Sequence, residues 1–190
     1  WHYNCQSLLI LYLKQNSIMK KLILFSAIAL FSFSGFAQKE TRTVPSVNLI
    51  DLEGNKVNTS DFSNDGKPMV INFWATWCKP CVAELNNISD LYTDWQEETG
   101  VKIIAIAIDD SRTAPKVGPY ANGKGWEYEI YKDVNQDFQR AIGFQSPPFT
   151  CLVDGSGKIV WTHSGYQEGD EEELYEAIKK LVSGESLEKH

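Results

Sequence analysis

The chain of 190 residues is 43% hydrophobic, which supplies one well-filled core and leaves too little length for a second large domain. All 25 acidic residues follow residue 37, but only 15 of the 18 basic residues do, so residues 38–190 carry a net charge of about −10. With this charge and no basic stripe, we expect no nucleic-acid partner, because a phosphate backbone would be repelled.

The first 37 residues predict a targeting segment. Met19 is followed by two lysines, an apolar run over residues 22–33 and small residues up to Ala37, which is the pattern of a secretory signal peptide at residues 19–37. The apolar run is short for a membrane span of about 20 residues, and an uncleaved N-terminal anchor is the alternative. We interpret residues 1–18 as a leader or a misplaced start. The mature domain is then residues 38–190, exported and soluble in the periplasm.

The first half of this domain predicts a hairpin, then a strand, a helix and a second strand. Two alternating segments within residues 47–62 fit a β-hairpin at the front of the domain. Residues 67–75 and 101–109 are almost unbroken apolar runs, typical of strands buried on both faces. The helix between them ends near Gly100, and the strand-helix-strand order implies a parallel pair. The expected buried face of the helix consists of Val82, Leu85, Ile88, Leu91 and Trp95.

The second half predicts, in chain order, a short interrupted helix over residues 111–125, an extended edge strand over 126–133 and a short helix over 134–144 that stops at Gly143. A hairpin of residues 149–154 and 158–163 follows, and then a closing helix over 170–184. The closing helix begins with acids and ends with lysines, as the helix dipole favours. Its expected apolar face consists of Leu174, Ile178, Leu181 and Val182. The pattern indicates an α/β domain with a mixed sheet and helices on both faces, its core over about residues 44–182.

The segment INFWATWCKPCVAEL, residues 71–85, contains Cys78 and Cys81 in a CxxC arrangement. A zinc site would need two further ligands, and residues 38–190 offer only Cys151, His163 and His190 for them. A structural disulfide is the other alternative, but closing so short a loop constrains the unfolded chain little. We therefore interpret the pair as a redox couple, with no metal and no cofactor beyond its own disulfide.

The predicted helix indicates how the two cysteines divide the work. At the helix start, Cys78 lies on unpaired backbone N–H groups and the positive dipole end, which favour a thiolate and make it the expected nucleophile. Lys79 either stabilises that thiolate or only solvates the surface, and Pro80 suits a first turn because it needs no N–H partner. Cys81 lies about one turn further along, on the buried side, as the resolving thiol that attacks the mixed disulfide.

Three segments together resemble a known family: FWATWCKPC at residues 73–81, SPPFTCLVDGSGKIV at 146–160 and VPSVNLIDLEGNKVNTSDF at 44–62. They are similar to the TlpA/ResA-like thiol-disulfide oxidoreductases, an AhpC/TSA-Redoxin-like group of the thioredoxin superfamily. The resemblance spans about residues 44–182 and implies a thioredoxin-like α/β fold, with a central mixed sheet flanked by helices and an N-terminal β-hairpin extension. It carries the family's CxxC to Cys78 and Cys81 and its active-site proline to Pro148.

Two positions differ from cytoplasmic thioredoxins in the way this subfamily does. Asn72, six residues before Cys78, stands where those thioredoxins carry a buried acid. Glu84, three residues after Cys81, matches the acidic residue of the ResA-like group and lies near that thiol on a helix. The resemblance implies that Glu84 takes and returns the proton of Cys81, an exposed helix glutamate being the alternative. Asn86 replaces a proline that is frequent in the family, so we expect no proline kink there.

The resemblance also implies a cis peptide bond between Pro147 and Pro148, beside the cysteines, where an extended substrate peptide can pair by strand addition. Because Pro147 has no N–H, one backbone contact of the relatives would be lost here, which predicts narrower or weaker peptide binding. The expected substrate-binding residues are Trp77, Lys79, Pro80, Pro147, Pro148 and Phe149. Of the two tryptophans near the pair, Trp74 and Trp77, one is expected in the core and the other over the disulfide. Cys151 is expected to be a small core residue.

The predicted function is an exported thiol-disulfide oxidoreductase that reduces protein disulfides as a monomer. A reductase in an oxidising compartment must be recharged, which implies a membrane electron donor of the CcdA or DsbD type. Apocytochrome c is one candidate substrate, through the cytochrome c maturation members of the family. Two alternatives remain open at this point: a thiol peroxidase of the peroxiredoxin type, and a copper-delivery metallochaperone, which the CxxC spacing disfavours.

Overall fold

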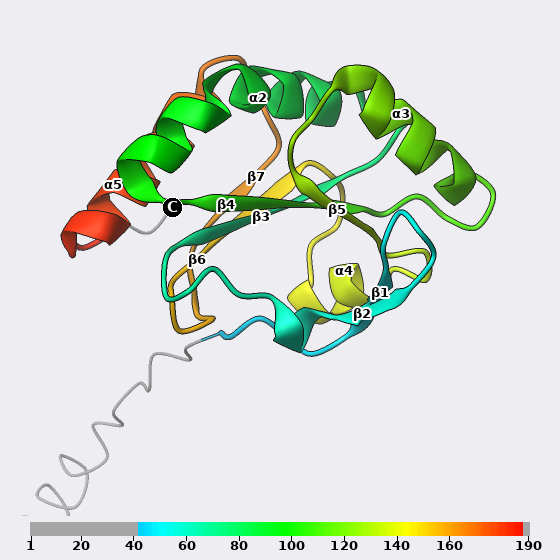
Figure 1. Ribbon diagram of the computed structural model, residues 1–190, viewed down its shortest axis with the longest axis horizontal. Coiled ribbons are helices and arrows are strands. Elements are labelled where there is room, and N and C mark those ends of the chain that lie inside the picture. Colours follow the sequence, from blue (N-terminus) through cyan, green and yellow to red (C-terminus); the bar gives the residue numbers. More distant parts are fainter. Residues whose placement is uncertain (1–41, 188–190) are drawn as a thin grey trace, which may run out of the picture. The chain divides into compact units, whose positions relative to one another are not determined.

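The computed structural model describes residues 42–187, so the predicted leader and signal lie outside the described residues. Seven strands form one mixed sheet in the order β2-β1-β5-β4-β3-β6-β7, with a thioredoxin-like α/β arrangement (Figure 1). The strands are β1 (Asn48–Ile50), β2 (Lys56–Asn58), β3 (Met69–Trp74), β4 (Lys102–Ala107), β5 (Glu129–Lys132), β6 (Phe149–Val153) and β7 (Ile159–Ser164). The helices are α2 (Lys79–Thr99), α3 (Val117–Lys124), α4 (Asp137–Ile142) and α5 (Asp170–Ser183), with 3₁₀ turns at Thr59–Asp61 and Ala114–Lys116.

Strand β3 lies in the interior of this sheet, between β4 and β6, and leads directly to the cysteine pair. It pairs in parallel with β4 and antiparallel with β6, and all six of its residues are buried. An apolar strand with neighbours on both sides satisfies its backbone groups by ladder hydrogen bonds while both faces are covered. The carboxyl end of β3 therefore delivers Cys78 to the middle of the sheet edge, and the parallel pair expected from the sequence is confirmed.

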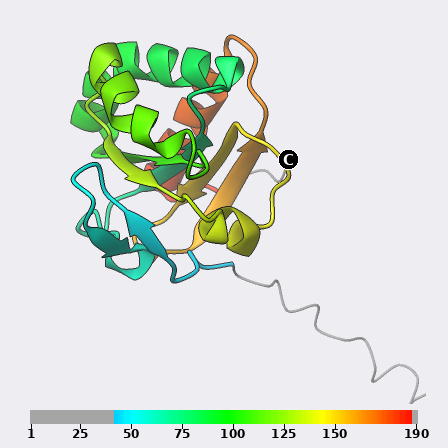
Figure 2. The ribbon, with the colours of Figure 1, turned by 90° about the vertical axis from the view of Figure 1, so that its right-hand side faces the viewer.

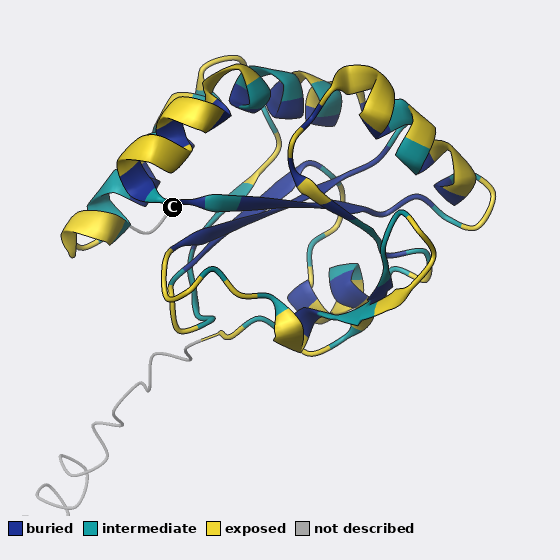
Figure 3. Ribbon diagram, viewed as in Figure 1, coloured by how far each residue is buried: buried dark blue, intermediate teal, exposed yellow. Residues whose placement is uncertain are grey.

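The helices cover both faces of the sheet, as predicted (Figures 1 and 2). Helices α2 and α3 lie along one face, where α5 contacts α2 and β6, and α4 lies on the opposite face beside β1. Figure 3 shows that the buried residues of these helices turn toward the sheet and the exposed ones away from it. Helix α2 ends where expected, at Gly100, whose φ of 68° is the left-handed conformation that favours glycine.

The predicted buried faces of α2 and α5 were wrong at one residue each. Leu91 is 39% exposed, and its neighbour Tyr92 is buried instead. The reason is specific contacts: the Tyr92 ring packs on Tyr128, with centroids 5.3 Å apart, and its hydroxyl accepts the Ile103 N–H at 3.1 Å. On α5, Val182 is 50% exposed, whereas the preceding Leu181 packs against the core.

The prediction that residues 126–133 form an edge strand was wrong. Strand β5 lies between β4 and β1, because the N-terminal hairpin adds to its outer side through the pair Ile50 and Lys132. The edges of the sheet are β2 and β7. The sequence of β5 alone does not indicate this, since its outer partner is about 80 residues earlier in the chain and pairing of that range leaves no local signal.

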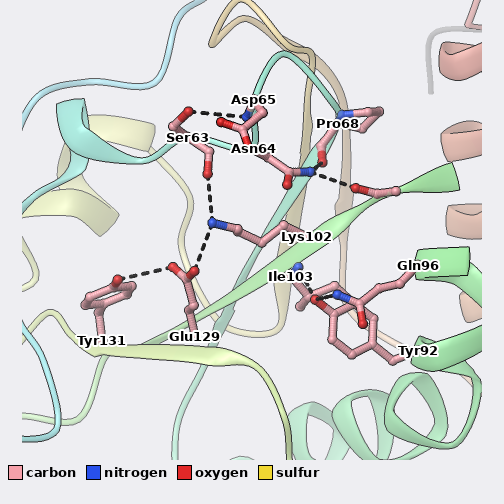
Figure 4. A network of polar contacts seen from close by, with 11 residues as sticks. Ser63, Asn64, Asp65, Pro68, Tyr92, Gln96, Lys102, Ile103, Glu129 and Tyr131 are labelled. Atoms are coloured by element: carbon pink, nitrogen blue, oxygen red, sulfur yellow. Dashed lines mark hydrogen bonds and ion pairs between the residues drawn. The ribbon is translucent and has the colours of Figure 1, made fainter.

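At the opposite end of β3 from the cysteines, a polar network fixes the loop that leads into this strand (Figure 4). The side-chain amide of Asn64 donates to the carbonyl oxygens of Pro68 at 2.7 Å and Gly100 at 2.8 Å. Lys102 donates to the Ser63 carbonyl at 2.8 Å and forms an ion pair with Glu129 at 2.9 Å. These contacts join the loop to the end of α2 and to β4, so they hold the scaffold and lie away from the site.

Candidate redox site

The cysteine pair lies at the N-terminus of α2 and is joined by a disulfide, with the two Cα atoms 5.3 Å apart. Cys78 is the N-cap residue, and its Sγ accepts the backbone N–H of Cys81 at 3.3 Å. When this sulfur becomes a thiolate, the backbone N–H groups at the helix N-terminus can donate hydrogen bonds to it. The dipole of this helix of 21 residues also stabilises the negative charge. Cys81 is fully buried and Cys78 is 5% exposed, so Cys78 is the more accessible residue of the pair in the disulfide state but is largely covered.

The segment between β3 and Cys78 is held by Asp109, which follows β4. One Asp109 oxygen accepts the Thr76 backbone N–H at 2.9 Å, and the other accepts the Thr76 hydroxyl at 2.5 Å. Asp109 is fully buried, so these bonds are shielded from water and fix the turn that presents the cysteines. Sequence reasoning missed this residue, although an acid that ends an apolar strand at the site edge was a usable signal.

The residues around the pair divide into exposed and buried ones. Trp77 is 59% exposed, and Trp74 is fully buried, which confirms that one tryptophan packs in the core. Lys79 and Pro80 are both exposed on the first turn of α2. An exposed indole next to a disulfide is an apolar surface that a substrate peptide can cover.

The Pro147-Pro148 bond is cis, as the family resemblance implied. Pro147 is half-buried and Pro148 is buried, and the Pro148 carbonyl accepts the Gly165 N–H at 2.9 Å. Phe149 is 9% exposed, and its ring stacks on Phe144 with centroids 4.6 Å apart. Phe149 therefore belongs mainly to an aromatic cluster under the loop, and Pro147 is the residue of this group with the most accessible surface.

Glu84 is buried in the interface between α2 and the sheet, with 4% of its surface exposed, so the alternative of an exposed helix glutamate is wrong. Its Oε1 accepts the Thr150 hydroxyl at 2.9 Å, and the same hydroxyl oxygen accepts the Asn72 side-chain N–H at 2.8 Å. Burial raises the pKa of Glu84 to about 7, while the hydrogen bonds from Asn72 and Thr150 act against that rise. Such a carboxyl can both accept and return a proton near neutral pH.

A second polar cluster lies on the α5 side of Glu84. Asn87 donates to the Tyr166 hydroxyl at 2.6 Å, and that hydroxyl donates to Glu171 at 2.7 Å. The charges of Asp170 and Glu171 add to the burial that raises the pKa of Glu84. No sequence signal pointed to this cluster, because its members come from α2, the loop after β7 and the first turn of α5.

The remaining candidate residues lie outside this constellation. Cys151 is a free, fully buried thiol on β6, and burial raises its pKa to about 12, so the prediction of a core residue is confirmed. His163 lies on the edge strand β7 and pairs with Asp170 at 3.2 Å. Asn86 accepts the Trp126 indole N–H at 3.1 Å. Within residues 42–187, no group of three His, Cys, Asp or Glu side chains is placed to hold a metal ion, and no helix could cross a bilayer.

Comparison with known proteins gives a consistent result. The model of the Redoxin family matches residues 39–178. The thiol-disulfide oxidoreductase ResA of Bacillus cereus is 30% identical over 179 residues, covering 90% of this chain and 99% of that protein. The thiol:disulfide interchange protein DsbE of Haemophilus influenzae is 33% identical over 65% of each chain. A solved structure of a thioredoxin-like protein from Porphyromonas gingivalis is 50% identical, with a TM-score of 0.67 and coverage of 74% of this chain and 92% of that one.

Proposed function

Since this chain belongs to the Redoxin family and is a thiol-disulfide oxidoreductase, we propose that it is an exported reductase of protein disulfides whose nucleophile is Cys78. The observation that carries the proposal is the unequal placement of the two sulfurs. Cys78 caps α2, on the N–H groups that stabilise a thiolate, while Cys81 is fully buried one turn further along. One sulfur can then meet an incoming disulfide while the other waits for the intermediate.

The reaction begins with the reduced protein. The Cys78 thiolate attacks one sulfur of a substrate disulfide, which forms a mixed disulfide and releases the other substrate sulfur as a thiolate that takes up a proton. The Cys81 thiol then loses its proton and attacks the Cys78 sulfur, which forms the Cys78–Cys81 disulfide found here and releases the second substrate thiolate. Two protein thiols and one substrate disulfide become one protein disulfide and two substrate thiols.

Glu84 is the proposed base for the second step. It lies three residues after Cys81 on α2 and therefore on the same side of the helix. A carboxylate with a pKa near 7 can accept the proton of Cys81 and later return it to a leaving substrate thiolate. Asn72, on the adjacent strand β3, carries an amide that does not ionise near neutral pH, so it cannot take this role.

The proposed substrate surface offers few backbone N–H groups to a substrate peptide. Its exposed part consists of Trp77, Lys79, Pro80 and the half-buried Pro147, with Trp77 as the most exposed large apolar side chain in the described residues. The buried Pro148 and Phe149 shape the surface from behind Pro147. Pro147 and Pro148 offer no backbone N–H, and the Pro148 carbonyl is already occupied by Gly165. An extended peptide can therefore pair with the Pro147 carbonyl but receives no N–H in return, which favours recognition by apolar contact.

We propose further that the protein works outside the cytoplasm, after cleavage of residues 19–37, and is recharged by a membrane donor of the CcdA or DsbD type. The sequence pattern of residues 19–37 supports export, and the names of the relatives support a protein disulfide as substrate. Apocytochrome c is a candidate client. N-terminal sequencing of protein recovered from the envelope should begin at Gln38, and a start at residue 19 would contradict cleavage.

The experiment that tests the function uses each cysteine in turn. Reduced wild-type protein should reduce insulin, Cys78→Ser should not, and Cys81→Ser should accumulate a mixed disulfide through Cys78. Cys151→Ala is the matched control, because Cys151 is buried and free and its variant should retain full activity. Insulin reduction by Cys78→Ser at the wild-type rate would refute the proposal. A reduction potential near −270 mV, rather than near −120 mV, would support a reductant.

A further inference from the structure

Three buried polar side chains from three different elements meet between the sheet and the second turn of α2, the helix that begins at the cysteine pair. Asn72 lies on β3, Thr150 lies directly opposite it on β6, and Glu84 lies on α2, which covers that face of the sheet. All three are at most 4% exposed. Polar groups buried to this extent require partners, so the pattern of their hydrogen bonds is strongly constrained.

The hydroxyl of Thr150 is the centre of this pattern. It accepts the Asn72 side-chain N–H at 2.8 Å and lies 2.9 Å from Oε1 of Glu84. A hydroxyl has one proton, and the Asn72 N–H already occupies one of its lone pairs, so its proton is directed to Oε1. Oε1 is thereby held as an acceptor. The other carboxyl oxygen, Oε2, is buried and has no hydrogen-bond partner among residues 42–187.

We propose that Thr150, oriented by Asn72, is a positioning residue that gives the two oxygens of Glu84 different roles: Oε1 is anchored, and Oε2 exchanges the proton with Cys81. This inference rests on the proposed function of Glu84. During oxidation of the dithiol, the proton of the Cys81 thiol passes to Oε2 while the Thr150 hydroxyl keeps its bond to Oε1. The hydroxyl stabilises the carboxylate form of Glu84, which is the form that accepts the proton. It also prevents rotation of the carboxyl group away from the sulfur of Cys81.

The test compares Thr150→Val, which has nearly the same shape without the hydroxyl, with Thr150→Ser, which keeps the hydroxyl. The oxidised protein is used because Cys78 and Cys81 do not titrate when they are joined in the disulfide, and the side-chain carboxyl carbon of Glu84 is followed by ¹³C NMR against pH. Loss of a hydrogen bond to the charged form should raise the titration midpoint of Thr150→Val by about one pH unit, and Thr150→Ser should stay near wild type. Glu84→Gln should remove the signal and so assign it.

Other titratable groups also act on Glu84, but they are identical in these variants. They are Asp170 and Glu171 on α5, Tyr166 before that helix and Tyr128 before β5. A difference in midpoint between Thr150→Val and Thr150→Ser therefore reports the hydroxyl. Asn72→Leu provides a second variant: it removes the N–H that orients the hydroxyl, and because hydrogen bonding by Asn72 itself lowers the pKa of Glu84, the midpoint should move in the same direction.

Two results would overturn the proposal. An unchanged midpoint in Thr150→Val would show that the hydroxyl does not act on the carboxylate. A downward shift would show that the hydroxyl accepts a proton from the acid form of Glu84, which reverses the assignment of the two oxygens. These outcomes are separate from failure of the function itself, because a protein in which Cys78→Ser abolishes insulin reduction can still give either of them.

Discussion

Replacing Glu84 with glutamine tests whether a carboxyl buried under the disulfide is held protonated by the fold. Glutamine has the same size and can still accept the Thr150 hydroxyl, so the substitution removes the ionisation and little else. We expect the variant to be more stable than the wild type at high pH and equally stable at low pH.

The magnitude follows from the pKa of Glu84, which burial raises from 4.5 to about 7. Below pH 4.5 both the folded and the unfolded wild-type chains are protonated at this residue, so it contributes no pH dependence. Between pH 4.5 and 7 the folded state keeps a proton that the unfolded state loses, and wild-type stability falls by about 1.4 kcal/mol per pH unit. Above pH 7 the loss is complete, at about 3 kcal/mol.

The assay is urea unfolding of the oxidised proteins at several pH values from 4 to 9, with the disulfide intact in both states. The difference in unfolding free energy between Glu84→Gln and wild type should grow from near zero to about 3 kcal/mol and then level off. Glu97→Gln is the matched control, since Glu97 is an exposed glutamate on the same helix. A difference that stays constant across the range would refute the reasoning, because it would mean that Glu84 ionises equally in the folded and unfolded chains.

Two further predictions concern the loop before β3 and the proline pair. Asn64→Ala removes two side-chain hydrogen bonds, to the carbonyls of Pro68 and Gly100, and should lower the unfolding free energy by about 1–3 kcal/mol. The rate of insulin reduction should stay unchanged. A slower reaction would contradict the view that this network serves only the scaffold. Pro147→Thr restores a backbone N–H beside the cysteines and should lower the Kd of a peptide disulfide, measured by calorimetry in a protein that also carries Cys81→Ser. Weaker binding would count against the view that the missing N–H limits peptide binding.

Much of the fold could be predicted because its signals are local. The apolar runs that became β3 and β4, the glycine that ends α2 and the hairpin around Gly157 each depend on a few neighbouring residues. The errors occurred where long-range contacts decide. Leu91 and Tyr92 are equally compatible with a helical stripe, and only the ring of Tyr128 and the N–H of Ile103 bury the tyrosine.

The site shows the same division. Cys78, Cys81 and the cis bond at Pro148 were predicted from short motifs and from the resemblance that they carry. Asp109 and Thr150 were not, because each acts on a residue more than 30 positions away and is unremarkable in its own segment.

The amino-acid sequence by itself determined the chemistry of this protein: a CxxC pair at a helix start, a glutamate three residues later and a proline pair to flank them. Only the tertiary structure decided how that glutamate behaves. Its burial by the sheet and its hydrogen bond to Thr150 come from strands and helices that meet only when the chain is folded, and the pKa of a carboxyl depends on its surroundings in space rather than on its neighbours in the chain.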